Sequence, residues 1–295
     1  MATFPRRRKP GAVPKAKTGK ISRFARIGRK KFDADGNPVR PRGIYLLPNA
    51  LTTAALFCGF YAIIQAMNMK FEHAAYAIFI AMILDGLDGR IARLTNTQSE
   101  FGAQYDSLSD MVSFGAAPAL VIYEWSLRGL PNKLGWIAAF IYCSGAALRL
   151  ARFNTNIEVV DKRFFQGLPS PAAAAMVAGF ILIMTDFAPD VGFSARELGW
   201  VSFGWTLFAG LTMVTNVPFY SFKDVNFRKP VSFIGLFLIA LAFALVSIDP
   251  HKVLMPIFVL YGLSGYVVYF WRLAKGKPVS MVQTETVNLD KNERR

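Results

Sequence analysis

The chain contains eight apolar segments that are long enough, or nearly so, to cross a bilayer as helices. They are approximately residues 44–66, 73–94, 104–125, 135–153, 169–187, 198–217, 230–248 and 253–272. Hydrophobic residues make up 53% of the 295 residues and charged residues only 18%, a composition that disfavours a soluble globular protein. The short connections favour one compact bundle over separate domains. The sequence therefore predicts an all-α fold, a polytopic membrane bundle of about eight transmembrane helices.

The connections between these segments differ in their content of basic residues. With the N-terminus inside, the inner side receives both chain ends and Arg90, Arg93, Arg149, Arg152, Lys162, Arg163, Lys223, Arg228 and Lys229. The outer side receives Lys70, Arg128, Lys133, Arg196 and Lys252. Basic residues concentrate in cytoplasmic loops of membrane proteins. We therefore expect a multi-pass protein of the cell (inner) membrane with both termini in the cytoplasm.

The N-terminal segment is strongly basic. Residues 1–43 contain 14 Lys or Arg against Asp33 and Asp35, which is +12 of the formal +15. Because the segment adjoins a predicted span, we expect it to bind anionic lipid headgroups, with residues 20–32 as an interfacial amphipathic stretch. A solvated tail is an equal alternative for residues 1–20, which are rich in proline. The predicted organisation is thus a basic cytoplasmic arm (1–43), a transmembrane domain (44–272) and a cytoplasmic tail (273–295).

Four aspartates lie at the predicted inner ends of the second and third spans, facing the cytoplasm. Asp85 and Asp88 are three residues apart, and Asp106 and Asp110 are four apart. On helices, each pair shares one face. Unpaired charge at membrane depth is costly, and four converging carboxylates repel one another unless cations neutralise them. Hard divalent ions prefer such oxygen ligands, so the pattern predicts a metal site.

The spacing of the aspartates resembles a known signature. The chain reads Asp85-x2-Asp88-Gly89-x2-Ala92-Arg93-x8-Gly102-x3-Asp106-x3-Asp110, which matches every fixed position of the CDP-alcohol phosphotransferase family signature. These are integral membrane enzymes that move a phospho-alcohol group from a CDP-linked donor to an acceptor hydroxyl. A structural ion-pair network of Asp85 and Asp88 with Arg90 and Arg93 is the alternative interpretation.

The resemblance implies a role for each carboxylate. Asp85, Asp88 and Asp106 would ligate metal, as a pair of Mg²⁺ or Mn²⁺ ions that bridge the pyrophosphate. Asp110 would contact the second ion and serve as general base toward the acceptor hydroxyl. In the same family a small hydroxyl residue contacts the donor at the position of Ser99, and the first helix contacts it through residues that match Asn49 and Thr52.

The residue types around the aspartates suit a bound nucleotide. Gly86, Gly89 and Ala92 leave one strip of the helix without bulky side chains, so a ligand can lie against the backbone; close helix packing is the alternative use of such residues. Arg93 projects near the face of Asp85 two turns later and could reach a phosphate oxygen. For Asn49, helix capping is an equal alternative.

A narrower resemblance extends over residues 44–180. Residues 46–52, 57–60, 148–154 and 165–174 resemble the membrane-bound phosphatidylserine synthases of this family. That likeness implies CDP-diacylglycerol as donor, L-serine as acceptor, and phosphatidylserine and CMP as products. Other acceptors, namely glycerol phosphate or choline, are the main rivals.

A zwitterionic acceptor needs a cation for its carboxylate. Arg149 and Arg152, at the inner end of the fourth span, could supply it, and Asn154 and Gln166 could add polar contacts. Alternatively, both arginines face lipid headgroups. At the start of the fifth span, we predict that Ser170 caps the helix rather than lining a pocket.

Proteins of other classes fit less well. A transporter would also place carboxylates within a bundle, but we find no inverted repeat or broken helix pair in the sequence. The basic arm contains no recognisable nucleic-acid motif, and we expect no nucleic-acid partner. A homodimer is compatible with the sequence, which leaves the oligomeric state open.

Overall fold

A computed structural model describes residues 31–32, 38–39, 46–95, 97–155, 164–221, 234–237, 241 and 249–275. The chain forms two units, Met1–Arg42 and Gly43–Arg295. In the first unit, β1 (Lys31–Phe32) pairs antiparallel with β2 (Pro38–Val39). The rest of the predicted arm, the tail beyond residue 275 and most of the predicted span 230–248 lie outside the described residues.

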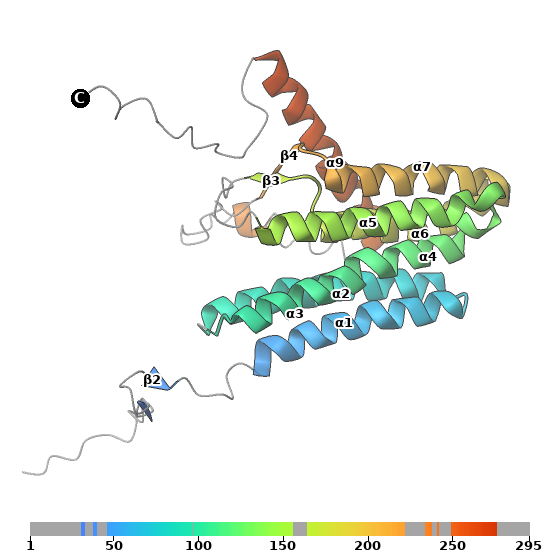
Figure 1. The fold of residues 1–295 in the computed structure, drawn as a ribbon. Helices are drawn as coiled ribbons and strands as arrows, with labels where there is room; N and C mark the ends of the chain where they lie inside the picture. Colours follow the sequence, from blue (N-terminus) through green and yellow to red (C-terminus); the bar gives the residue numbers. More distant parts are fainter. Residues whose placement is uncertain are drawn as a thin grey trace, which may run out of the picture. The chain divides into compact units, whose positions relative to one another are not determined.

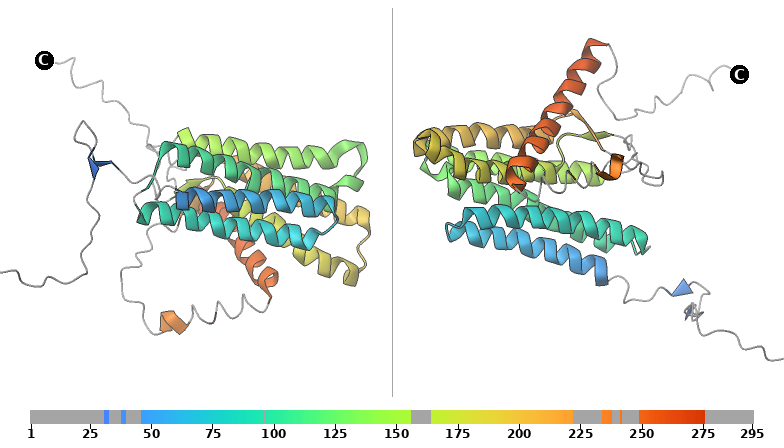
Figure 2. Two further views of the ribbon diagram at one scale, coloured as in Figure 1. Left: turned by 90° about the horizontal axis from the view of Figure 1, so that it is seen from below. Right: turned by 180° about the vertical axis from the view of Figure 1, so that it is seen from behind.

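The second unit is helical. Its described helices are α1 (Leu46–Met67), α2 (Phe71–Leu94), α3 (Glu100–Asp110), α4 (Ala117–Trp125), α5 (Leu134–Thr155), α6 (Ser170–Val191), α7 (Ala195–Val214) and α9 (Pro250–Ala274). Figures 1 and 2 show α1 to α7 side by side with nearly aligned axes, whereas α9 crosses them steeply. The expectation of a helical chain is therefore confirmed.

Four described helical stretches are long and apolar enough to cross a membrane. They are Leu47–Met67, Pro131–Thr155, Ser170–Val191 and Lys252–Ala274. Helix α2 is more polar because Asp85, Asp88, Arg90 and Arg93 lie in its second half. The described part of the chain therefore contains several helices of membrane-spanning character.

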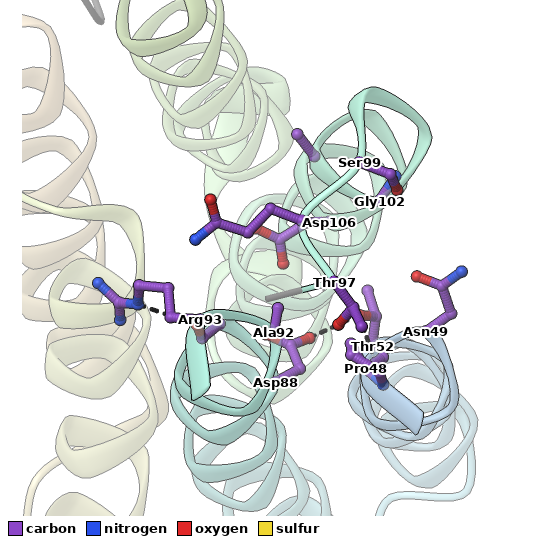
Figure 3. Close-up of a pocket in the computed structure, with 13 residues that line it drawn as sticks. Pro48, Asn49, Thr52, Asp88, Ala92, Arg93, Thr97, Ser99, Gly102 and Asp106 are labelled. Carbon is purple, nitrogen blue, oxygen red and sulfur yellow. Dashed lines mark hydrogen bonds between the residues drawn. The ribbon is translucent and has the colours of Figure 1, made fainter. Parts of the chain in front are cut away.

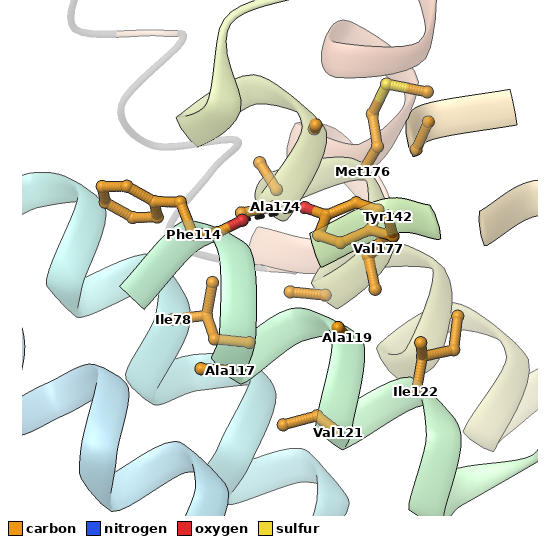
Figure 4. Close-up of a cluster of buried hydrophobic side chains, with 14 of the residues drawn as sticks. Ile78, Phe114, Ala117, Ala119, Val121, Ile122, Tyr142, Ala174, Met176 and Val177 are labelled. Atoms are coloured by element: carbon orange, nitrogen blue, oxygen red, sulfur yellow. Dashed lines mark hydrogen bonds between the residues drawn. The ribbon is translucent and has the colours of Figure 1, made fainter. Parts of the chain in front are cut away.

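The third predicted segment is one helical run with a change of winding. Helix α3 ends at Asp110, a π-helical stretch η2 covers Met111–Ala116, and α4 continues from Ala117. Two side chains bond to this run: Tyr142 on α5 donates to the Phe114 carbonyl at 3.1 Å, and Ser113 donates to the Ala55 carbonyl of α1 at 3.1 Å. Figure 4 shows the contact between Tyr142 and Phe114. The π-helix thus begins directly after the last aspartate and is held by hydrogen bonds to α1 and α5.

The core is built around α6. Its residues Ala172–Ala175 and Ala178 are buried, and the helix contacts α2, α4, α7 and α9. Small side chains allow such close approach of helix backbones. The same effect brings α5 against α7, where a Cβ added at Gly145 would lie 2.5 Å from the Gly210 carbonyl oxygen. Close packing through small residues therefore holds α5, α6 and α7 together.

A short sheet that the sequence pattern did not predict precedes α6. Strand β3 (Phe164–Gln166) pairs antiparallel with β4 (Pro218–Tyr220), with Phe165 opposite Phe219. Gly167 follows with φ +76°, and a Cβ there would lie 2.2 Å from the Met213 carbonyl oxygen, so the position requires glycine. This turn ties the start of α6 to the end of α7.

Helix α7 begins with a capping box. The Ser194 hydroxyl accepts from the Glu197 backbone N–H, and the Glu197 carboxylate accepts from the Ser194 N–H. The Ser194 hydroxyl also donates to the Glu197 carboxylate at 2.6 Å. This bond first, and then the one from the Ser194 N–H, lower the pKa of Glu197 below its usual value. The motif fixes where the connection from α6 ends.

Candidate active site

Three aspartates from two helices meet at one point. One carboxylate oxygen each of Asp85 and Asp88 on α2 and of Asp106 on α3 lie within 4.8 Å of one another. Asp110 is not in this group, but its carboxylate interacts electrostatically with that of Asp85. The spacing of the aspartates predicted that each pair would share a helix face, and the fold turns the two faces toward each other.

The donor set fits a hard divalent cation. Oδ1 of Asp106 and Oδ1 of Asp110 are buried and have no hydrogen-bond partner among the described residues. A buried carboxylate oxygen without a donor is costly unless a cation binds it. Carboxylate oxygens gathered within a few ångströms are the ligands that Mg²⁺, Mn²⁺ and Ca²⁺ prefer. The cluster of Asp85, Asp88 and Asp106 can therefore hold a divalent metal.

Helix α1 holds the cluster from one side. The Thr52 hydroxyl lies 2.6 Å from Oδ2 of Asp88 and 3.1 Å from the Pro48 carbonyl oxygen. Ser109 on α3 in turn donates to the Thr52 carbonyl at 3.2 Å. Thr52, Asp88 and Ser109 are all buried. These contacts fix the orientation of the Asp88 carboxylate relative to α3.

A cavity of about 320 Å³ opens beside the cluster, between α1, α2 and the start of α3 (Figure 3). It is lined by Pro48, Asn49, Thr52, Asp88, Gly89, Ala92, Arg93, Thr97, Gln98, Ser99, Gly102, Ala103 and Asp106. Of the predicted donor-binding residues, Asn49, Thr52, Gly89, Arg93 and Ser99 lie in this lining. Asp85 and Gly86 do not, although Asp85 reaches the cavity's carboxylates.

Two glycines of α2 lack a packing partner. A Cβ added at Gly86 or at Gly89 would meet no atom within 4 Å in the described structure. Glycines that serve helix packing are in close contact instead, as Gly145 is with Gly210. At Gly89, which lines the cavity, space for a ligand is the use that agrees with this geometry. Gly86 lies outside the lining, and its geometry shows only that no neighbouring helix packs against it.

Polar residues of the lining have distinct local roles. Ser99 is the N-cap of α3, and its hydroxyl accepts from the Gly102 N–H at 3.0 Å while it faces the cavity. Asn49 lies inside the first turn of α1 rather than at its N-cap. Arg93 donates from Nε to the Gly89 carbonyl at 3.0 Å, which fixes the base of its guanidinium.

Sequence reasoning missed Thr97 and Gln98, which line the cavity from the connection between α2 and α3. They lie in sequence between Arg93 and Ser99, two residues of the predicted donor site, and this position could have indicated that they line the same cavity. Because they belong to neither helix, no periodicity pointed to them.

In the described structure, no hydrogen bond joins any two of the four residues predicted for the acceptor. Arg149 interacts electrostatically with Asp85 and Asp110, and its guanidinium donates to the Ser170 hydroxyl. Arg152, one turn later, donates instead to the Asn216 side chain at 3.1 Å.

Asn154 and Gln166 lie elsewhere. Asn154 donates to the Ser107 hydroxyl at 3.0 Å, on the exposed end of α5, and Gln166 is in β3 opposite Pro218. Among these four residues, Arg149 is the one that interacts with the carboxylates.

The predicted capping role of Ser170 is wrong. Helix α6 begins at Ser170, its N-cap is Pro169, and no side chain caps it. The Ser170 hydroxyl is fully buried and accepts from Arg149. Because Pro169 is the N-cap, Ser170 is the first residue of the helix and not the residue before it. Its hydroxyl therefore binds a side chain of another helix.

Comparisons with known proteins agree on one family. The family described as CDP-alcohol phosphatidyltransferase matches residues 45–217. A relative from Helicobacter pylori (strain J99) is 33% identical over 230 residues, covering 78% of this chain and 94% of its own. One from Mycobacterium tuberculosis (strain H37Rv) is 32% identical, covering 77% and 79%, and one from Methanocaldococcus jannaschii is 34% identical, covering 64% and 82%. All three are named CDP-diacylglycerol–serine O-phosphatidyltransferase.

Proposed function

Because this chain belongs to the CDP-alcohol phosphatidyltransferase family, we propose that it transfers the phosphatidyl group of CDP-diacylglycerol to the hydroxyl of L-serine. The products are phosphatidylserine and CMP. The observation that carries the proposal is the meeting of Asp85, Asp88 and Asp106 beside a cavity, in a chain whose relatives bear the name of this enzyme.

The cavity between α1 and α3 is the proposed donor site. Its 320 Å³ volume is within the range of ligand pockets, and its mixed lining suits a nucleotide whose lipid chains extend into the bilayer. Arg93 would bind a phosphate oxygen, and Asn49, Thr52 and Ser99 would contact the cytidine diphosphate. The open backbone at Gly86 and Gly89 would allow the nucleotide to lie against α2.

Asp85, Asp88 and Asp106 are the proposed metal ligands, with Asp110 as a contact to a second ion. Mg²⁺ or Mn²⁺ ions held there would neutralise charge on the pyrophosphate and on the departing CMP. Thr52 keeps the Asp88 carboxylate in a fixed orientation through its 2.6 Å hydrogen bond. Without such neutralisation, the four carboxylates would repel an anionic donor.

Asp110 is the proposed general base. It accepts the proton of the serine hydroxyl as the hydroxyl oxygen forms its bond to phosphorus and the bond from phosphorus to the CMP oxygen breaks. Arg149 would bind the serine carboxylate, since it lies beside Asp110. Arg152, Asn154 and Gln166 are the further proposed acceptor contacts; in the described structure their partners are Asn216, Ser107 and β4.

The membrane arrangement is proposed from charge and helix length together. Eight spans within residues 44–272 would leave the basic arm, the tail and the aspartate-bearing end of the bundle in the cytoplasm, next to anionic lipids. Tags fused to the two ends should both resist protease that is added outside intact spheroplasts. Digestion of one tag and protection of the other would contradict an even number of spans.

An acceptor panel tests the proposed reaction. Purified full-length protein in mixed micelles receives CDP-diacylglycerol, Mg²⁺ or Mn²⁺, and serine, glycerol 3-phosphate or choline in separate reactions, and the lipid product is identified. Phosphatidylserine should form, with one CMP released per lipid. CMP release with another alcohol but not with serine would contradict the acceptor assignment, and no CMP release with any alcohol would contradict the reaction class. An Asp190→Asn variant, at an exposed position near the far end of α6, controls for loss of a carboxylate alone.

A further inference from the structure

Arg149 and Ser170 form a contact that the family signature does not contain. Arg149 lies near the end of α5, and its Nη1 donates to Oγ of Ser170, the first residue of α6. Ser170 is fully buried. Because Pro169 occupies the N-cap, the serine hydroxyl is not used to cap the helix and is available to another side chain.

The backbone around Ser170 is held firmly. The Gly167 N–H donates to the Val217 carbonyl at 2.9 Å, and the Leu168 N–H donates to the Thr212 carbonyl at 3.2 Å. Pro169 and Pro171 restrict the chain on both sides of the serine. The backbone before Ser170 is therefore bonded to the end of α7 and to the residue before β4, which fixes the position of the hydroxyl.

Arg149 lies between groups that compete for its guanidinium. Asp85 and Asp110 attract it, and the Phe153 ring lies 6.0 Å from its central carbon. Among the residues that the structure describes, its hydrogen bond goes to Ser170, and it forms no ion pair with either aspartate. An ion pair with Asp110 would occupy both the proposed cation for the acceptor and the proposed base.

We infer that Ser170 is a positioning residue: its hydroxyl holds the Arg149 guanidinium beside Asp110 in the orientation that binds the carboxylate of the acceptor amino acid. This inference rests on the proposed function, because it takes serine as the acceptor. The hydroxyl contacts neither substrate; it acts through Arg149 alone.

Steady-state kinetics of Ser170→Ala tests the inference. Loss of a hydrogen bond to a charged group should raise the serine KM about tenfold. The KM for CDP-diacylglycerol should stay within about twofold of wild type, since the contact is on the acceptor side. Ser202→Ala is the matched control, because Ser202 is also fully buried and its hydroxyl donates within its own helix to the Leu198 carbonyl.

A double-mutant cycle separates positioning from packing. In an Arg149→Ala background, Ser170→Ala should cause no further rise in the serine KM, whereas two independent structural defects would add. If Ser170→Ala does not yield folded protein, Ser170→Cys keeps the volume and replaces the hydroxyl by a weaker acceptor; it should give an intermediate serine KM.

Three outcomes would overturn the inference. An unchanged serine KM in folded Ser170→Ala or Ser170→Cys leaves the hydroxyl a packing group only. A raised KM for CDP-diacylglycerol instead assigns Arg149 to the donor phosphate. If the wild-type protein makes no phosphatidylserine but uses another alcohol, the proposed function is wrong. The inference is then wrong as well, because it assumes an acceptor with a carboxylate. Wild-type activity with serine therefore distinguishes the two failures.

Discussion

Thr52 and Asp88 are joined by a 2.6 Å hydrogen bond across 36 residues of sequence. The bond links α1 to α2 at the edge of the cavity, and both side chains are buried. A hydroxyl that donates to a carboxylate oxygen leaves the other oxygen available to a metal and fixes its direction. Thr52 thus has a role in the carboxylate cluster, beside its proposed contact with the nucleotide.

Thr52→Val removes this hydrogen bond and keeps the shape of the side chain. The concentration of Mg²⁺ or Mn²⁺ that gives half-maximal activity should rise about tenfold, because partners of metal ligands commonly contribute that much to affinity. Metal titration of the purified variant measures the change. Thr206→Val is the control: Thr206 is buried too, but its hydroxyl donates to the Ser202 carbonyl within α7. An unchanged metal requirement in Thr52→Val would show that Asp88 needs no support from α1.

Asparagine substitutions test the carboxylate cluster. Asp85→Asn, Asp88→Asn and Asp106→Asn should each lower turnover by about a hundredfold or more, since each removes charge that stabilises the transition state. Each variant should remain folded, because the change relieves repulsion among buried carboxylates. Chelation should inactivate wild type, and added Mg²⁺ or Mn²⁺ should restore it. Full activity after exhaustive chelation would contradict a metal site.

Two glycine substitutions should have opposite consequences. Gly89→Ala adds a methyl group to open space in the cavity lining, so it should raise the KM for CDP-diacylglycerol. It should leave thermal stability unchanged or higher, because glycine costs a helix about 0.5–1 kcal/mol relative to alanine. Gly145→Ala would collide with the Gly210 carbonyl and should lower stability by about 1–3 kcal/mol.

Thermal unfolding and donor kinetics of the two glycine variants, measured side by side, check this prediction. If Gly89→Ala lowers stability as much as Gly145→Ala and leaves the donor KM unchanged, Gly89 serves packing and not the ligand.

The sequence predicted most helix bounds because hydrophobic length is a local property. The expected segment 44–66 became α1 (Leu46–Met67), and 253–272 became α9 (Pro250–Ala274). The shared face of Asp85 and Asp88, and that of Asp106 and Asp110, were also predictable, since residues three or four apart lie on the same side of a helix. Both results depend only on short stretches of sequence.

Features that depend on distant contacts were not predictable in this way. The π-helical stretch after Asp110 is fixed by Tyr142 on α5, which no local pattern relates to Phe114. The strand pair β3–β4 joins segments about 50 residues apart, and three residues per strand are too few to show a period. The hydroxyl of Ser170 was assigned to its own helix because capping is a local contact, whereas its partner Arg149 lies on another helix.

The family resemblance gives Asp110 two roles, general base and metal contact, and variants of this residue can distinguish them. It lies beside Asp85, yet outside the group of three carboxylates whose oxygens approach within 4.8 Å. Asp110→Asn should lower kcat by about a hundredfold to ten-thousandfold if the residue accepts the proton of the acceptor hydroxyl. Equilibrium binding of labelled CDP-diacylglycerol should change little, because the lost interaction belongs to proton transfer.

Metal titration of the same variant then decides between the roles. A base that does not ligate metal leaves the half-activating concentration of Mg²⁺ or Mn²⁺ unchanged while kcat falls. A shared ligand raises that concentration as well, and saturating metal then recovers part of the rate. Retention of wild-type kcat in folded Asp110→Asn would contradict both roles. The acceptor hydroxyl would then have to lose its proton to another carboxylate of the cluster, and Asp85, which interacts electrostatically with Asp110, would be the first candidate.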